Sequence, residues 1–191
     1  MGTKAGITLE QVVETAETIA DRDGFSALTL AAVAAGLGIK SPSLYSYVDG
    51  LAGLRRQLMI RAAGEMHRRF AAAVDGLEGF EAVRSLAAAY RQFAIERPGM
   101  YDGLLERAPR PGEDDEVYVA LGRPVEVVEG VLSGLGVDPA VRVHLVRGLR
   151  SMLHGFVDIE NKSGFGRPVD IDQSFETAVE MVVNAIVAAI D

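Results

Sequence analysis

Apolar residues recur every three or four positions along most of the chain, and this spacing predicts amphipathic helices. The first helix is bounded by Thr8, which has the spacing of a capping box with Gln11, and by the stop Asp23-Gly24. No segment shows a convincing strand pattern. The pattern predicts an all-α fold of about nine helices, over residues 8–22, 29–37, 42–47, 49–74, 80–97, 100–107, 117–135, 139–160 and 174–190.

Two of these helices, between Thr29 and Val48, are short and joined by a tight turn. Thr29 is a favoured N-cap, Gly38 supplies permissive backbone where the first helix ends, and Pro42 suits the first turn of the second. This arrangement predicts a helix-turn-helix, whose second helix reads the DNA major groove, although an ordinary helical hairpin has the same spacing. Hydroxyls and one cation suit phosphates and base edges, so the candidate DNA-binding residues are Thr29, Lys40, Ser41, Ser43, Tyr45 and Tyr47.

The same stretch carries a resemblance to a known family. The segments "VVETAETIADRDGFSALT" and "LTLAAVAAGLGIKSPSLYSYV" resemble the DNA-binding region of the TetR family of bacterial repressors. Near the other end, "RSMLHGFVDIENKSGFGRP" and "SFETAVEMVVNAI" resemble the C-terminal domain of a branch with a His-Gly-Phe step. The resemblance implies a helix-turn-helix domain over residues 1–50, a helical ligand-binding and dimerisation domain over residues 51–191, and repression by default.

Two departures from the family pattern concern DNA affinity. The family places a Lys near the start of the fourth helix and an Arg in the first helix of the helix-turn-helix, whose two helices we call the reading pair. This chain has Leu51 and Ala31 at these positions. Both changes imply weaker nonspecific binding. They keep a second interpretation open, in which the chain is a helical small-molecule-binding or interaction protein with a weakened DNA-binding head.

The net charge of −8 is unusual for a DNA-binding protein, so its distribution matters. Residues 1–60 carry five cations and six anions, and most of the acidity lies beyond them. The chain has no cysteine, which excludes disulfides and thiolate chemistry. No charge-free run is long enough to cross a bilayer and no apolar leader opens the chain, so we expect a cytoplasmic protein.

An enzyme is the alternative class of protein, but the chain offers few candidate catalytic residues. The three histidines, His67, His144 and His154, have no motif partner, and no serine lies in a Gly-x-Ser-x-Gly elbow. The glycines of "NKSGFGRP" lack the Lys-Ser/Thr ending of a phosphate-binding loop. The acidic run 113–116 is typical of solvated charge at a helix start. We therefore expect no enzymatic activity, no cofactor and no metal.

The middle of the chain, residues 75–155, concentrates aromatic and methionine side chains with a few polar tips. Such residues form adaptable apolar walls, although at helical spacing they also simply fill a core. The resemblance implies that a ligand in this domain moves the long fourth helix and weakens DNA binding. We expect a small, largely apolar effector, with candidate contacts at Tyr90, Phe93, Met100, Tyr101, Tyr118, Arg147, Met152 and His154.

The last helix carries an apolar stripe wider than a terminal helix of a small domain needs. Packed with its neighbour and their symmetry mates, it would form a four-helix dimer interface. A homodimer also fits two-fold DNA sites, because paired reading helices lie one DNA turn apart. The alternative is internal docking of the stripe. Candidate dimerisation residues are Leu149, Phe156, Phe175, Val179, Val182 and Ile186.

Overall fold

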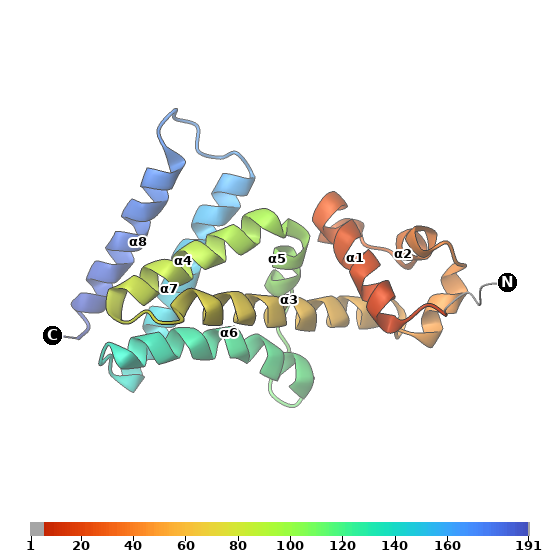
Figure 1. Ribbon diagram of the computed structural model, residues 1–191, viewed down its shortest axis with the longest axis horizontal. Helices are drawn as coiled ribbons and strands as arrows, with labels where there is room; N and C mark the ends of the chain where they lie inside the picture. Colours follow the sequence, from red (N-terminus) through yellow and green to blue (C-terminus); the bar gives the residue numbers. More distant parts are fainter. Residues whose placement is uncertain (1–5, 191) are drawn as a thin grey trace. The chain divides into compact units, whose positions relative to one another are not determined.

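The computed structural model describes residues 6–190, which fold into α-helices and short 3-10 helices without a strand in that range (Figure 1). The predicted all-α fold is confirmed. In chain order the elements are α1 (Leu9–Asp23), η1 (Phe25–Ala27), α2 (Leu30–Leu37), η2 (Ser41–Ser46), α3 (Gly50–Val74), α4 (Gly79–Glu96), α5 (Pro98–Leu105), α6 (Asp115–Gly134), α7 (Pro139–Asn161) and α8 (Ile171–Val187).

Local sequence signals explain where the first helices begin and end. The Thr8 side chain accepts a hydrogen bond from the Gln11 backbone, and the Gln11 side chain accepts one from the Thr8 backbone, so the predicted capping box is confirmed. Thr29 caps α2 by accepting from the backbone N–H of Ala32. Gly38 ends α2 in the left-handed region, at φ 66°, which a glycine adopts without strain.

Two elements differ from the sequence-based expectation. The second helix of the reading pair is a 3-10 helix, η2, in which the N–H of Tyr47 bonds to the carbonyl of Leu44 three residues earlier. The expected start of the last helix at Ser174 is wrong. Helix α8 begins at Ile171, because the carboxylate of Asp170 caps it by accepting from the backbone N–H groups of residues 172 and 173.

The chain forms two compact units. Unit 1 comprises the described residues up to Gly64 together with Arg97–Leu121, and unit 2 comprises Glu65–Glu96 and the described residues from Gly122 onward. The reading pair, the first part of α3 and all of α5 therefore pack as one body. The division at residue 50 into a DNA-binding domain and a ligand-binding and dimerisation domain stays a prediction.

Each unit has its own apolar core. In unit 1 the buried side chains come from α1, η1, the helix-turn-helix, α3 and α5, among them Val12, Ala16, Phe25, Leu28, Val33, Leu44, Leu54, Leu58, Met100 and Tyr101. In unit 2 they come from α4, α6, α7 and α8, among them Val83, Leu86, Phe93, Leu132, Leu149, Leu153, Val157, Phe175, Val179 and Ile186. Among the described residues no helix is both long and apolar enough to cross a membrane.

Helix α5 lies directly against α1. A Cβ atom added at Gly99 would lie 2.1 Å from the backbone carbon and oxygen of Ala20, so only glycine fits at this contact. The reading pair is also closely packed, since a Cβ at Gly36 would lie 2.8 Å from a methyl carbon of Thr15 on α1. These approaches hold α2 and α5 on either side of unit 1's first helix.

Candidate DNA-binding and ligand-binding residues

All six candidate DNA-binding residues lie in one stretch of unit 1, between the start of α2 and the end of η2. Leu44 and Val48 are buried beneath this stretch, so the intervening side chains of η2 point outward. Tyr45 is 66% exposed, which is a large fraction for an aromatic side chain. Ser43 and Lys40 are exposed as well, whereas Ser41 and Tyr47 are half-buried. This segment, residues 29–47, which we call the reading stretch, therefore presents a surface of hydroxyls and one ammonium group.

Two hydroxyls in this region have structural bonds of their own. The Ser46 hydroxyl donates to the carbonyl of Ser43 at 2.6 Å, so its proton is already used within η2. The Thr29 hydroxyl oxygen accepts from the α2 backbone at 3.1 Å and still has its proton to donate. Thr29 can thus cap α2 and contact a phosphate at the same time.

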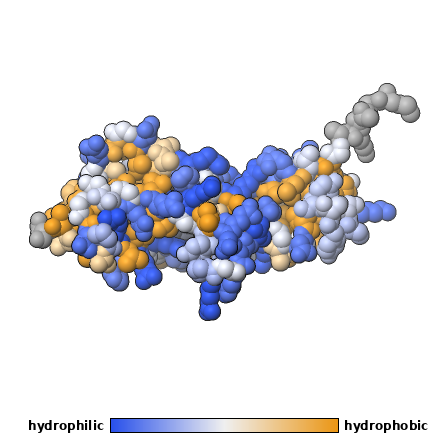
Figure 2. All heavy atoms as spheres, turned by 90° about the horizontal axis from the view of Figure 1, so that it is seen from below, coloured by the Kyte–Doolittle hydropathy of each residue, from blue (hydrophilic) through white to orange (hydrophobic). Residues whose placement is uncertain are grey.

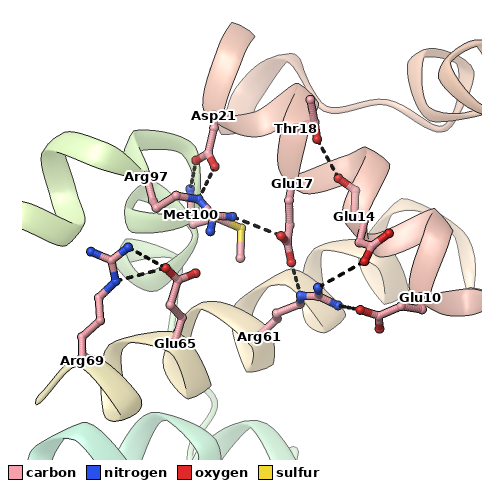
Figure 3. A network of polar contacts seen from close by, with 10 residues as sticks. All are labelled: Glu10, Glu14, Glu17, Thr18, Asp21, Arg61, Glu65, Arg69, Arg97 and Met100. Atoms are coloured by element: carbon pink, nitrogen blue, oxygen red, sulfur yellow. Dashed lines mark hydrogen bonds and ion pairs between the residues drawn. The ribbon is translucent and has the colours of Figure 1, made fainter. Parts of the chain in front are cut away.

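A row of carboxylates along α1 pairs with arginines within unit 1 (Figure 3). Arg61 on α3 binds Glu10 at 2.6 Å, approaches Glu14 at 4.0 Å and pairs with Glu17. Glu17 is the least exposed of the three carboxylates. Arg61 therefore offsets acidity that would otherwise repel DNA from the head.

The same row continues to the start of α5. Arg97 binds Asp21 at 2.5 Å and Glu17 at 3.1 Å. The second oxygen of Asp21 accepts from the backbone N–H of Met100 at 3.0 Å and so satisfies one of the free donors at the α5 N-terminus. Two charged side chains and the close contact at Gly99 together fix α5 to α1.

Three carboxylates of the acidic run at the start of α6, namely Glu113, Asp114 and Glu116, also have arginine partners. Arg56 on α3 binds Asp114 through two nitrogens and Glu116 through one, at 2.5, 2.8 and 2.7 Å. The hydrogen bonds from Arg56 lower the pKa of the Asp114 carboxyl below its usual range. Glu113 accepts from Arg107. These carboxylates are paired, which the sequence pattern of solvated helix-start charge did not predict.

Lys40 contrasts with these paired cations. It is exposed and has no acidic partner among residues 6–190. Arg22, the other cation of the described head before α3, pairs with Asp23 at 2.6 Å. Lys40 is therefore the cation of the reading stretch that remains available to a phosphate.

The eight candidate ligand-binding residues are divided between the units. Met100, Tyr101 and Tyr118 belong to unit 1, where the first two are buried and Tyr118 is 48% exposed. The other five belong to unit 2. There Tyr90 and Phe93 are buried, Met152 and His154 are half-buried, and Arg147 is exposed. Their role in binding stays a prediction.

The candidate dimerisation residues face largely inward. Leu149, Phe175, Val179 and Ile186 are buried within unit 2, and the ring of Phe156 packs on those of Phe165 and Phe175. Val182 is half-buried. This strongest apolar stripe of α8 is thus used by the unit's own core.

The outward faces of α7 and α8 carry a weaker pattern that the sequence reading missed. On each face uncharged residues are spaced alternately four and three apart, namely Gly148, Met152, Gly155 and Ile159 on α7 and Ser174, Ala178, Met181 and Ala185 on α8. Met181 is 69% exposed. Apolar surface is also visible around the C-terminal end of the chain (Figure 2). Small side chains at this spacing let helices approach closely.

Comparison with known proteins gives consistent matches. Residues 83–182 match the protein family described as "Tetracyclin repressor-like, C-terminal domain". The HTH-type transcriptional regulator YobS of Bacillus subtilis is 32% identical over 187 residues, which cover 97% of this chain and 96% of YobS. The HTH-type transcriptional regulator Rv0681 of Mycobacterium tuberculosis is 36% identical over 175 residues, covering 92% of this chain and 79% of Rv0681.

A solved structure shares the fold. ActR of Streptomyces coelicolor, in complex with (S)-DNPA, superposes with a TM-score of 0.69 at 18% sequence identity, covering 96% of this chain and 98% of ActR. At this identity the likeness concerns the fold alone.

Proposed function

The chain belongs to the TetR family of helix-turn-helix transcriptional regulators, and from this we propose that it represses genes beside its operator until a small molecule releases it. The single observation that carries the proposal is the exposed stretch from Thr29 to Tyr47, where an aromatic ring and several hydroxyls face outward from a closely packed head. We place this action in the cytoplasm, where the DNA is, and assign the chain no reaction of its own.

Contacts with the operator are mostly uncharged in this proposal. Ser43, Tyr45 and Tyr47 supply hydroxyls and ring surface for base edges and thymine methyl groups, while Lys40 and Thr29 hold phosphates. Each neutralised phosphate contributes about 0.9 to the slope of log K against log salt concentration. With one available cation in the reading stretch, operator binding should depend on salt less steeply than for a basic head.

A gel-shift or anisotropy titration against the DNA flanking the protein's own coding region tests this function. Tyr45→Ala should weaken operator binding by about tenfold, because a good base-edge contact is worth about 1–3 kcal/mol. Tyr118→Ala removes a tyrosine that is 48% exposed and lies outside the reading stretch, and in the absence of any effector it should leave operator affinity unchanged. The proposal fails when the wild-type protein binds no flanking fragment more tightly than random duplex.

Lys40→Ala separates phosphate contacts from base contacts. Its effect should be similar on all DNA sequences, and it should reduce the salt slope by about one. A change of specificity without a change of slope would place Lys40 on a base edge instead.

The operator-bound form is a homodimer in this proposal, joined through the outward faces of α7 and α8. The uncharged four-and-three spacing on both helices is suited to a four-helix bundle with the symmetry-related pair. The small residues Gly148, Gly155 and Ala178 allow close approach, and a Cβ added at either glycine meets nothing within 4 Å in the free chain. A dimer also sets two reading heads about 34–36 Å apart, one DNA turn.

Sedimentation velocity tests the dimer. Met181→Glu buries a charge in the proposed interface and should produce monomers that keep their helical spectrum. Val169→Glu makes the same change at a similarly exposed position in the loop before α8 and should remain dimeric. Ile186→Glu is unsuitable, because Ile186 is buried in the core of unit 2 and the change would unfold it. A dimeric Met181→Glu protein would refute this interface.

The releasing ligand is a small, largely apolar molecule in this proposal. ActR, whose structure holds (S)-DNPA, supports a small molecule as the signal because it shares the fold. Release requires the ligand to prefer the form that does not fit the operator, typically by about 1–3 kcal/mol. A thermal-shift screen of hydrophobic metabolites, followed by addition of the hits to the operator complex, tests it. Hits that stabilise the protein without changing operator affinity would contradict the sensor role.

A further inference from the structure

A groove of about 800 Å³ lies between α4 and α8, entirely within unit 2. Its apolar lining comes from Ala88 and Ile95 of α4 and from Phe175 and Val179 of α8. Ile95 is 49% exposed, so apolar surface reaches the open side of the groove. The volume lies within the range of sites for small organic molecules, about 300–1,000 Å³.

The charged side chains around the groove are not balanced. Four carboxylates line it, against two guanidinium groups, and they are Glu96, Asp172, Glu176 and Glu180 against Arg84 and Arg91. Counting the ion-pair partners behind the lining adds one charge of each sign, Arg69 beside Glu96 and Glu160 beside Arg91. The groove therefore has an excess of two negative charges on either count.

Both arginines are already engaged by carboxylates. Arg84 binds Glu180 through two nitrogens, at 2.5 and 2.9 Å. Arg91 binds Glu160 through two nitrogens, at 2.8 and 2.5 Å, and Asp172 at 2.7 Å. An anionic ligand would have to displace one of these bidentate pairs. The groove is consequently unsuited to anions.

Arg91 is also fixed from its flat side. Its guanidinium carbon lies 4.8 Å from the centre of the Phe175 ring and 5.9 Å from that of Phe156. Cation–π contacts and carboxylates together hold Arg91 as part of the groove wall. The groove therefore has a preformed wall, and Arg91 is not free to bind a ligand.

Glu176 is the carboxylate that has no such partner. It is exposed, and none of the ion pairs or side-chain hydrogen bonds among residues 6–190 involves its carboxylate. The carboxyls of Glu180 and Glu96 stay ionised at neutral pH, because hydrogen bonds from Arg84 and Arg69 lower the pKa of each. An unpaired negative charge thus stands beside an apolar surface large enough to hold an aromatic or aliphatic body.

We propose that the groove between α4 and α8 binds an organic cation with an apolar body, such as an aryl phosphonium or aryl ammonium ion. The body buries against Ala88, Ile95 and Val179, and the positive centre faces Glu176. Binding of a cation in this groove does not depend on operator recognition, so an experiment can detect cation binding when operator binding is absent, and the reverse.

Isothermal titration calorimetry with two ions of the same shape and opposite charge tests the proposal on the full-length protein. Tetraphenylphosphonium should bind, and tetraphenylborate should bind at least about tenfold more weakly because the groove's excess charge repels it. Equal affinity for the two ions would overturn the assignment of a cation. Absence of phosphonium binding would overturn the site.

Two pairs of variants locate the binding. Ala88→Leu fills the groove from an exposed helical position and should abolish phosphonium binding, whereas Ala71→Leu, exposed on α3, should not. Glu176→Gln should weaken binding by about two- to fivefold, as expected for one solvent-exposed charge. Glu126→Gln makes the same charge change on α6 and should have no effect. Phosphonium binding that Ala88→Leu leaves intact would place the cation elsewhere and refute the proposal.

Discussion

Replacing Gly99 by alanine is the sharpest single test of how α5 is joined to the head. Gly99 lies in the first turn of α5, and an added Cβ would lie 2.1 Å from the carbonyl carbon and oxygen of Ala20 and 2.5 Å from the backbone N of Asp21. All three atoms belong to the backbone of α1, so no side-chain rotation can relieve the overlap. The two helices would have to separate, and the nearby bonds of Asp21 to Arg97 and Met100 would lengthen with them.

The size of the effect follows from two opposing contributions. Overpacking a closely packed contact typically costs about 1–3 kcal/mol. Alanine in place of glycine in a helix offsets this by about 0.5–1 kcal/mol. Because the contact is backbone against backbone, we expect a net loss of about 2 kcal/mol, and for a protein of this size that lowers the midpoint of thermal unfolding by roughly 4–8 °C.

Thermal and urea unfolding followed by circular dichroism measure this loss. Gly130→Ala on α6 is the matched control, since a Cβ there meets nothing within 4 Å. That variant should gain about 0.5–1 kcal/mol. A Gly99→Ala protein as stable as the wild type, or more stable, would show that α5 does not approach α1 this closely.

Three further changes have defined outcomes. Arg91→Gln leaves Glu160, which is 15% exposed, without its cation and should lower the free energy of unfolding by about 2 kcal/mol, measured by urea unfolding. Arg91→Lys should restore only part of this stability, because an ammonium group cannot bind a carboxylate bidentately. Lowered carboxyl pKa values at Glu96, Asp114 and Glu180 give stability that is present above about pH 4 and is lost as the pH falls further, so melting temperatures should drop below that pH. Leu51→Lys adds a cation at the half-buried start of α3 and should tighten DNA binding and steepen its salt slope by about one, measured by anisotropy.

The reading head was predictable because its signals are local. Thr8, Thr29 and Gly38 specify their caps and turn through residues within a few positions, and the structure has each of them in the predicted role. The start of α8 was predicted one turn late. The predicted start at Ser174 rested on the apolar spacing from Phe175 onward, whereas the carboxylate of Asp170 accepts from two backbone N–H groups and starts the helix at Ile171.

The surfaces that lie between distant segments were not predictable. Periodicity marks the strongest apolar stripe of α8, yet it does not say whether that stripe packs inside the unit or against a second subunit. Val179 and Ile186 turned out to be buried internally, which left the weaker stripe around Met181 facing outward. Likewise the α4–α8 groove combines residues such as Arg84 and Glu180 that are 96 positions apart, and no local pattern relates them.

The ion pairs of unit 1 explain how an acidic chain can carry a DNA-binding head. A count along the sequence gives the first 60 residues slightly more anions than cations, but it leaves out Arg61 and Arg97, which pair with carboxylates of α1 and offset part of their charge. The charge that matters for DNA is therefore that of the unpaired groups, and at the reading stretch this is Lys40. We therefore expect the head to gain its affinity from Tyr45 and the hydroxyls around it rather than from phosphate neutralisation, so specific binding should persist at salt concentrations that remove nonspecific binding.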